Sequence, residues 1–185
     1  MDIINLEKLP LEILHSDFNL ICVSVFHDKD QLIDKIYNFR NLFKDNFNDN
    51  SVTSREGTIN YVSTIINNQS DRKMYVIMIN SKIIGHYCLK HCHNNRVLLD
   101  NAVRFSSFGP RNIFSTVSKV LVQELLKNFS SPIIFTAIKN GNIAANKIHN
   151  YGVFIKNREK FSDLNYAQDI ECSYLDIKTF KYDKV

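Results

Sequence analysis

The strongest constraint on the fold is a set of three strand-length apolar segments between residues 74 and 106. The first two, 74–79 (MYVIMI) and 83–91 (IIGHYCLKH), are separated by the polar residues Asn80, Ser81 and Lys82, a spacing typical of a β-hairpin. The third segment, 96–106, follows a second short polar break. We therefore expect a three-stranded meander at the centre of the molecule.

Helical and extended segments alternate around this meander. Apolar residues recur at intervals of three and four over 29–47 and 55–67, which predicts two amphipathic helices, the first capped by Asp28. A loop is expected at 46–51, and Gly152 is expected to end the helix 142–151 in a left-handed conformation. The remaining predictions are strands at 20–26, 132–139, 153–155 and 171–177 and a helix at 113–129.

The resulting order, β-α-α-β-β-β-α-β-α-β-β, predicts a mixed α/β sandwich with one central sheet and helices on both faces. A chain of 185 residues fits a single domain, 1–185. The formal charge is +4 and no Lys/Arg run exceeds two residues, so we expect no nucleic-acid partner.

No apolar run approaches the roughly 20 residues that a membrane-spanning helix needs, so no membrane association is expected. Residues 1–10 lack the pattern of a signal peptide. The cysteines are scattered and three of them lie in apolar runs, which predicts buried free thiols in a cytoplasmic protein. They are Cys22, Cys88, Cys92 and Cys172.

Residues 140–153 (NGNIAANKIHNYGV) come directly after a predicted strand. They resemble the sequence motif that follows strand five in the GNAT superfamily of acyl-CoA-dependent N-acetyltransferases. The hairpin 77–85 (IMINSKIIG) and the order of elements are similar to that family too, over about residues 20–178. The resemblance implies acetyl-CoA as co-substrate and an amine as acceptor. It also implies that Asn142 caps a helix and that Ala145 keeps this helix thin where the cofactor lies.

Asp100 and Asn101 interrupt the otherwise apolar strand 97–103 (VLLDNAV). Polar side chains inside a buried strand need hydrogen-bond partners or a break in the ladder, so a β-bulge is expected here. The resemblance implies that this strand splays from its neighbour, that the backbone of Asn101, Ala102 and Val103 holds the pantetheine arm, and that Asp100 is the general base. A bulge alone, or a hydrogen-bonded core aspartate, would explain Asp100 equally well.

The segment 106–113 (SSFGPRNI) occupies the position of the family's pyrophosphate loop, but only Gly109 matches that motif. Pro110 suits the opening of a helix. Arg111 and Asn112 are candidates for phosphate contact, with Arg104 or Lys119 as helpers, whereas a solvated loop arginine is the alternative for Arg111. The departure leaves the identity of the acyl donor open.

The general acid is ambiguous between His149 and Tyr151. The family places a tyrosine seven residues after the asparagine, where this chain has His149, and Tyr151 follows two residues later. A phenol suits protonation of a thiolate because it stays protonated at neutral pH. On one continuous helix the two side chains would lie about 200° apart and could not face the same thiol.

Three histidines and two cysteines crowd the segment 86–93, which raises the alternative of a metal site; they are His86, Cys88, His91, Cys92 and His93. On a strand, Cys88 and Cys92 would lie roughly 13 Å apart, too far to bind one zinc. We therefore expect no metal, and we expect His86 to contact substrate.

The sequence predicts an N-acyltransferase that moves acetyl from acetyl-CoA to the amine of a small molecule, with an amino sugar or its nucleotide conjugate as one candidate. The alternatives are a GNAT-fold binding or regulatory protein without activity, and an enzyme with another acyl thioester donor. A homodimer is compatible with this prediction.

Overall fold

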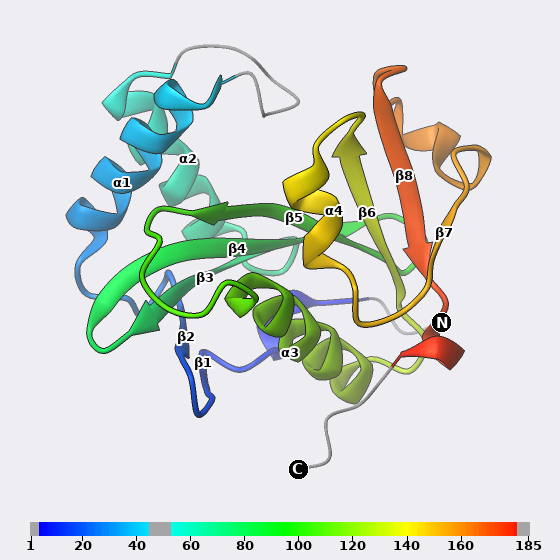
Figure 1. Cartoon of the computed structure of the whole chain (residues 1–185), viewed down its shortest axis with the longest axis horizontal. Helices are drawn as coiled ribbons and strands as arrows, with labels where there is room; N and C mark the ends of the chain where they lie inside the picture. The colour runs from blue at the N-terminus through cyan, green and yellow to red at the C-terminus, as the bar shows by residue number, and fades with distance from the viewer. Residues whose placement is uncertain (1–3, 45–52, 181–185) are drawn as a thin grey trace.

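A computed structural model describes residues 4–44 and 53–180. Its eight strands form one sheet and four α-helices pack around it (Figure 1). The strands are β1 (Glu12–Leu14), β2 (Asn19–Cys22), β3 (Arg72–Ile79), β4 (Lys82–Cys92), β5 (Arg96–Arg104), β6 (Ile133–Lys139), β7 (Phe154–Lys156) and β8 (Ile170–Leu175). The helices are α1 (Lys29–Leu42), α2 (Arg55–Asn67), α3 (Ile113–Asn128) and α4 (Ile143–Ile148), with short 3-10 segments η1 (Leu6–Lys8), η3 (Glu159–Leu164) and η4 (Ile177–Thr179).

The strand order is β1-β2-β3-β4-β5-β6-β8-β7, which confirms the predicted mixed α/β sandwich with a central meander β3-β4-β5. All neighbouring strands pair antiparallel except β5 and β6. This pair is parallel because α3 carries the chain back across the sheet between them. The prediction missed β1, a three-residue edge strand.

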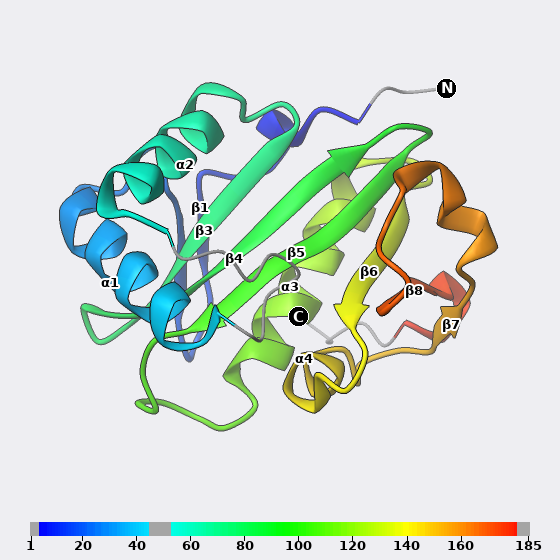
Figure 2. The same cartoon turned by 90° about the horizontal axis from the view of Figure 1, so that it is seen from above.

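The sheet carries a hydrophobic core on each face. Tyr75 and Ile77 of β3 pack in the core that contains α3, whereas Met74 and Val76 pack in the core that contains α1 and α2. Figure 2 shows α1 and α2 over one face and α3 beneath the strands. Because β3 and β4 are covered on both sides, their sequences are continuous apolar runs and not alternating ones.

Two predicted elements are shorter in the structure. The strand predicted at 20–26 ends at Cys22, where the chain enters a turn. Val23 and Phe26 are apolar because their side chains are buried in the core under α1 and α2, although they lie outside the strand. The helix predicted at 29–47 ends at Leu42. Its last part and the predicted loop 46–51 fall on residues 45–52, outside the described residues.

The prediction for Gly152 was wrong. Helix α4 ends at Ile148, and His149 is its C-cap residue. Gly152 lies three residues beyond that cap and does not adopt a left-handed conformation. A Cβ atom on Gly152 would lie 2.7 Å from Cδ1 of Leu175, so glycine lets the Leu175 side chain of β8 pack closely against this turn.

A buried lysine fastens the N-terminal segment to the sheet. The side chain of Lys73 is fully buried, and its ammonium donates to the backbone carbonyls of Leu6, Glu7 and Leu9 at 3.2, 3.5 and 2.6 Å. The Tyr75 hydroxyl adds a bond of 2.6 Å to the carbonyl of Pro10. Since burial disfavours the charged form, the pKa of Lys73 is lowered.

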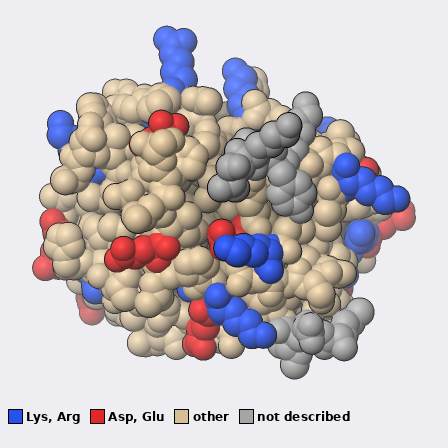
Figure 3. Space-filling view, turned by 90° about the horizontal axis from the view of Figure 1, so that it is seen from below, with Lys and Arg blue, Asp and Glu red and all other residues tan. Residues whose placement is uncertain are grey.

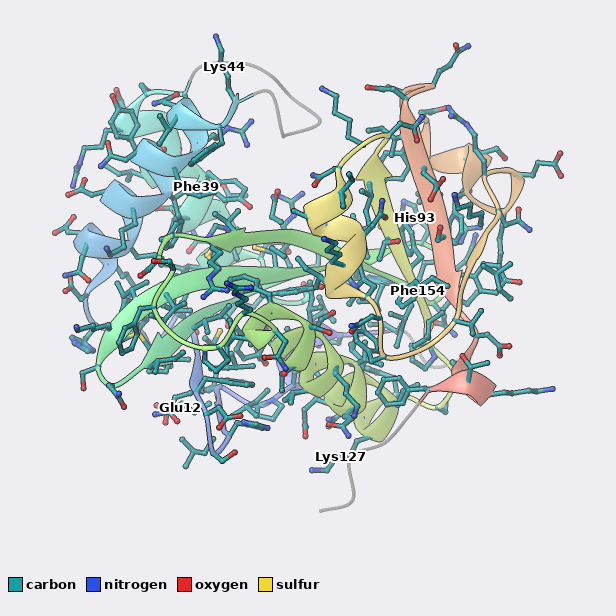
Figure 4. The ribbon with its side chains drawn as sticks, in the orientation of Figure 1. Glu12, Phe39, Lys44, His93, Lys127 and Phe154 are labelled. Carbon is teal, nitrogen blue, oxygen red and sulfur yellow. The ribbon has the colours of Figure 1, made fainter. Side chains whose placement is uncertain are left out.

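Replacing Lys73 by methionine would leave these carbonyl oxygens without their donor. We expect the Lys73→Met variant to lose about 1–3 kcal/mol of unfolding free energy in urea titration, the cost of buried unsatisfied polar groups. Lys127→Met is the matched control, since Lys127 lies at the end of α3 with 75% of its side chain exposed (Figure 4). Equal stabilities of the two variants would contradict this account.

Candidate active site

The site begins where two parallel strands separate. Strands β5 and β6 pair over Arg96–Leu98 and Ile133–Phe135, and their pairing ends there. Beyond Leu98 they diverge, as Figure 2 shows. Parallel strands normally keep their ladder to the end, so the divergence leaves backbone groups of β5 facing an opening in the sheet.

A β-bulge lies on β5 at this opening. His86 pairs with Val103 and Cys88 with Asp100, so Tyr87 faces both Asn101 and Ala102. Asn101 has a φ of 41°, a left-handed conformation that asparagine tolerates. The bulge expected from the two polar residues is therefore present.

The bulge turns two consecutive side chains toward the same face. Asp100 pairs with Cys88, which packs in the core under α1 and α2, and the Asn101 amide donates to the Tyr61 hydroxyl of α2 at 3.0 Å. In a regular strand these side chains would point to opposite faces. The Tyr61 hydroxyl also lies 3.9 Å from the thiol of Cys88.

The opening forms a cleft of about 320 Å³ that Asp100 lines. Burial raises the pKa of the Asp100 carboxyl, and the nearby positive charges of Arg72 and Lys90 partly oppose that shift. The nearest of these, Arg72 Nη2, lies 3.9 Å from Asp100 Oδ2. Asp100 is therefore a half-buried carboxyl that lines the cleft, and its carboxylate is more basic than that of a solvated aspartate.

A cluster of hydroxyl groups lies on the other face of the sheet. Ser118 of α3 is within 2.9 Å of the Tyr87 hydroxyl and 2.7 Å of the Tyr151 hydroxyl. His149 Nδ1 is 3.3 Å from both Ser118 Oγ and Tyr151 Oη. Burial lowers the pKa of His149 to about 3, so its imidazole is neutral.

His149 and Tyr151 do not lie on one continuous helix, which was the premise for placing their side chains about 200° apart. Because α4 ends at Ile148, the two residues lie in a turn and both reach the Ser118 hydroxyl. Their access to the cleft differs: His149 and Tyr87 line it, and Tyr151 is buried behind them.

A groove of about 630 Å³ continues from the cleft between β5 and α4 toward the start of α3. It brings together most of the residues predicted to bind the cofactor, namely Ala102, Val103, Arg111, Asn112, Asn142 and Ala145. Asn142 Oδ1 accepts from the Ala145 backbone N–H at 3.0 Å, which confirms the predicted cap. Asn101 lines the neighbouring cleft. Gly109 supports the loop from outside the groove, with a φ of 89°.

The loop 106–111 closes around an arginine. The Arg104 guanidinium donates to the six backbone carbonyls of residues 106–111, at 2.7 to 3.4 Å. These bonds involve Nε, Nη1 and Nη2, so Arg104 orders the loop, and its side chain also lines the groove. Lys119 does not line the groove.

His86 lies in the wall of a separate cavity of about 320 Å³, between α1, α2 and the sheet. Its side chain is 2% exposed, and its Nδ1 has no hydrogen-bond partner. The ring packs against Phe105, with centroids 5.4 Å apart. Burial lowers the pKa of His86 to about 3, which keeps the imidazole neutral.

Sequence reasoning missed four residues of the site: Tyr61, Arg72, Tyr87 and Ser118. Ser118 carried the one available signal, a hydroxyl residue within the apolar stripe of a helix. Tyr87 and Arg72 lie in strand segments whose sequence pattern does not distinguish a site residue from a core or edge residue.

Other classes of site find little support in the described residues 4–44 and 53–180. All four cysteines are buried and free, as predicted, and no group of three His, Cys, Asp or Glu residues is arranged to hold a metal ion. None of the described helices is long and apolar enough to cross a membrane. Acidic and basic side chains are interspersed on the face shown in Figure 3.

Comparison with known proteins gives a structural answer only. No protein-family model matches this sequence, and a search of curated proteins finds no match. Solved structures do match. The N-acetyltransferase PseH of Campylobacter jejuni is similar with a TM-score of 0.59 at 11% identity, over 90% of this chain and 98% of PseH.

Two further structures agree. An acetyltransferase of Salmonella typhimurium that modifies the N-terminal serine of ribosomal protein L7/L12 has a TM-score of 0.65 at 13% identity, over 90% of this chain and 96% of its own. MccE, the microcin C7 self-immunity acetyltransferase solved with acetyl-CoA and AMP, has a TM-score of 0.63 at 15% identity, over 86% and 92%. The chain therefore has the fold of the GNAT N-acetyltransferases, as the order of elements and residues 140–153 predict.

Proposed function

We propose that this protein transfers an acetyl group from acetyl-CoA to the amine of a small molecule. The observation that carries the proposal is the cleft between β5 and β6, which has Asp100 in one wall and His149 in another. The fold similarity supports it, since solved proteins of this fold include MccE with bound acetyl-CoA and the N-acetyltransferase PseH.

The groove has the chemistry that CoA requires. The backbone of Asn101–Val103 is not paired with β6, which leaves groups available to an amide-containing arm. Ala144 and Ala145 keep the α4 side of the groove thin. Arg111 and Lys147 bring positive charge, and the first turn of α3 offers backbone N–H groups to a diphosphate.

Asp100 is the proposed general base. A neutral amine attacks the thioester carbonyl, and its proton must be removed as the new amide bond forms. The half-buried Asp100 carboxylate lies in the wall of the cleft, and its raised pKa makes it a better proton acceptor than a solvated aspartate. The positive charge of Arg72, 3.9 Å away, favours the ionised form of the carboxyl and so opposes part of the rise in its pKa.

His149 and Tyr87 are the groups proposed to hydrogen bond the departing sulfur, because both line the cleft. When Nδ1 of the neutral His149 accepts from Ser118 or Tyr151, the imidazole proton lies on Nε2. Tyr151 then has a positioning role: its hydroxyl, 2.7 Å from Ser118, fixes the ring of His149.

We expect millimolar acetyl-CoA to stabilise the protein against thermal unfolding, by about 2.7 kcal/mol at 100 times the dissociation constant. Ala145→Glu should abolish this shift, because it places a bulky carboxylate in the groove. Asn146→Glu adds the same charge to an exposed position of the same helix and should leave the shift intact.

The outcomes separate the alternatives. No shift with acetyl-CoA, but a shift with a longer acyl thioester, would indicate another donor. A shift without acetylation of any amine would indicate a binding or regulatory protein. Equal effects of the two glutamate variants would contradict the assigned groove.

Asp100→Asn should lower kcat by about 10²–10⁴-fold, the usual contribution of a general base. Only the ionised carboxylate accepts a proton, so the wild-type kcat should rise with pH through the raised pKa of Asp100. In the Asp100→Asn variant, kcat should no longer rise with pH over this range. Asp17→Asn, in the exposed turn between β1 and β2, is the control. An unchanged rate and pH profile in Asp100→Asn would remove Asp100 from the mechanism.

A further inference from the structure

A cavity the size of a small-molecule site lies beside the cleft. Its volume of about 320 Å³ is at the lower end of small-molecule sites, which suits a molecule of the size of an amino acid or a monosaccharide. Helices α1 and α2 form one wall and the sheet forms the other. Arg40, Arg72 and Asn101 line both this cavity and the cleft that holds Asp100, so the two spaces meet at these residues.

The charges of this cavity have one sign. Among the described residues, its charged lining side chains are Arg40 of α1 and Arg72 of β3. Of the residues that the structure describes around the adjoining cleft, Asp100 is the one carboxylate, and that cleft adds Lys90 and Lys139. A ligand with several positive charges would be repelled here, whereas a negatively charged group would be attracted.

One residue in the wall of this cavity has a buried polar atom without a partner. His86 Nδ1 is buried in its wall without a hydrogen bond, and the neutral ring can donate or accept. Buried polar atoms in folded proteins are almost always paired, so an unpaired one that lines a cavity indicates a polar group of a ligand or a water molecule. The hydroxyls of Thr58 and Tyr61 lie in the same lining.

We propose that the acceptor is a small amine that also carries a carboxylate or a phosphate, with the anionic group bound by Arg40 and Arg72 and a polar group bound by His86. This inference rests on the proposed function, which it narrows to one substrate class. The anion anchors the molecule at the junction of the two spaces, and the amine then points toward Asp100. Arg72 contributes to both parts, since it lines the cavity and lies 3.9 Å from Asp100.

Matched acceptors test the proposal. With acetyl-CoA, the release of free thiol would be measured for glucosamine 6-phosphate against glucosamine, and for amino acids against their amides, with spermidine as a purely cationic amine. We expect kcat/KM to be at least tenfold higher for the anionic member of a pair. Comparison of the phosphate pair with the carboxylate pair identifies the anion.

Arg40→Gln provides the residue-level test and leaves Asp100 and Arg72 in place. This substitution should raise KM at least tenfold for the acceptor with the anionic group, with little change in kcat. The KM of the matched analogue that lacks the anionic group should not change. Arg55→Gln is the control, because Arg55 lies on α2 outside the cavity and pairs with Asp34 at 2.7 Å. Equal effects of Arg40→Gln on both acceptors would overturn the proposal.

Binding of the unacetylated amines, measured by calorimetry without acetyl-CoA, separates this inference from the proposed function. Anion-dependent binding that needs Arg40 but gives no turnover would overturn the acetyltransferase and leave the ligand class standing. Turnover that favours neutral or cationic amines would overturn the ligand class and leave the acetyltransferase. Absence of both anion-dependent binding and anion-dependent turnover would overturn the ligand class.

Discussion

The parallel pairing of β5 and β6 ends at Leu98, and the organisation of the site depends on that interruption. A continued ladder would fill the space between the strands and close the sheet. Instead, the bulge at Asn101 interrupts β5, and the Asn101 side chain joins that of Asp100 on the face covered by α1 and α2. His149 and Tyr87 reach the same cleft with the Ser118 hydroxyl cluster behind them, so an acyl thioester in the opening would have a base on one side and hydrogen-bond donors on the other.

The loop between β5 and α3 is ordered by an arginine side chain at its centre. Anion-binding loops generally use glycines so that backbone N–H groups can turn inward. Here the carbonyl groups of residues 106–111 converge on the Arg104 guanidinium. This internal cation orders a loop in which Gly109 alone matches the family motif. The basic side chains that line the groove are Arg104, Arg111 and Lys147.

Much of the fold could be predicted from the sequence because its signals are local. The apolar runs of β3 and β4 and the periodicity of α2 set those elements, and the polar pair Asp100-Asn101 marked the bulge. Three features left no such signal. Val23 and Phe26 are buried although they lie outside the strand, and Gly152 packs closely against Leu175 from a distant strand. The bonds of Arg104 are local, but they form only when the loop 106–111 is folded around the guanidinium.

The site was predicted in part for the same reason. Asp100, Asn142 and Ala145 lie in segments whose sequence patterns resemble those of a known family. The structure places them around one cleft and its groove. Arg72 and Tyr61 come from other segments and reach the site only through the sheet and the packing of α2, so sequence spacing could not identify them. The relation of His149 to Tyr151 depended on where α4 ends, and the boundaries of an element are harder to predict from sequence than its existence.

A crystal structure of the protein with CoA would test the central claim most directly. The account predicts that the pantetheine arm lies between β5 and β6 against the backbone of Asn101–Val103, and that the diphosphate contacts Arg111 and the first turn of α3. The thiol should lie between Asp100 and His149. A CoA molecule bound elsewhere, or a cleft that stays closed to it at saturating concentration, would contradict the account.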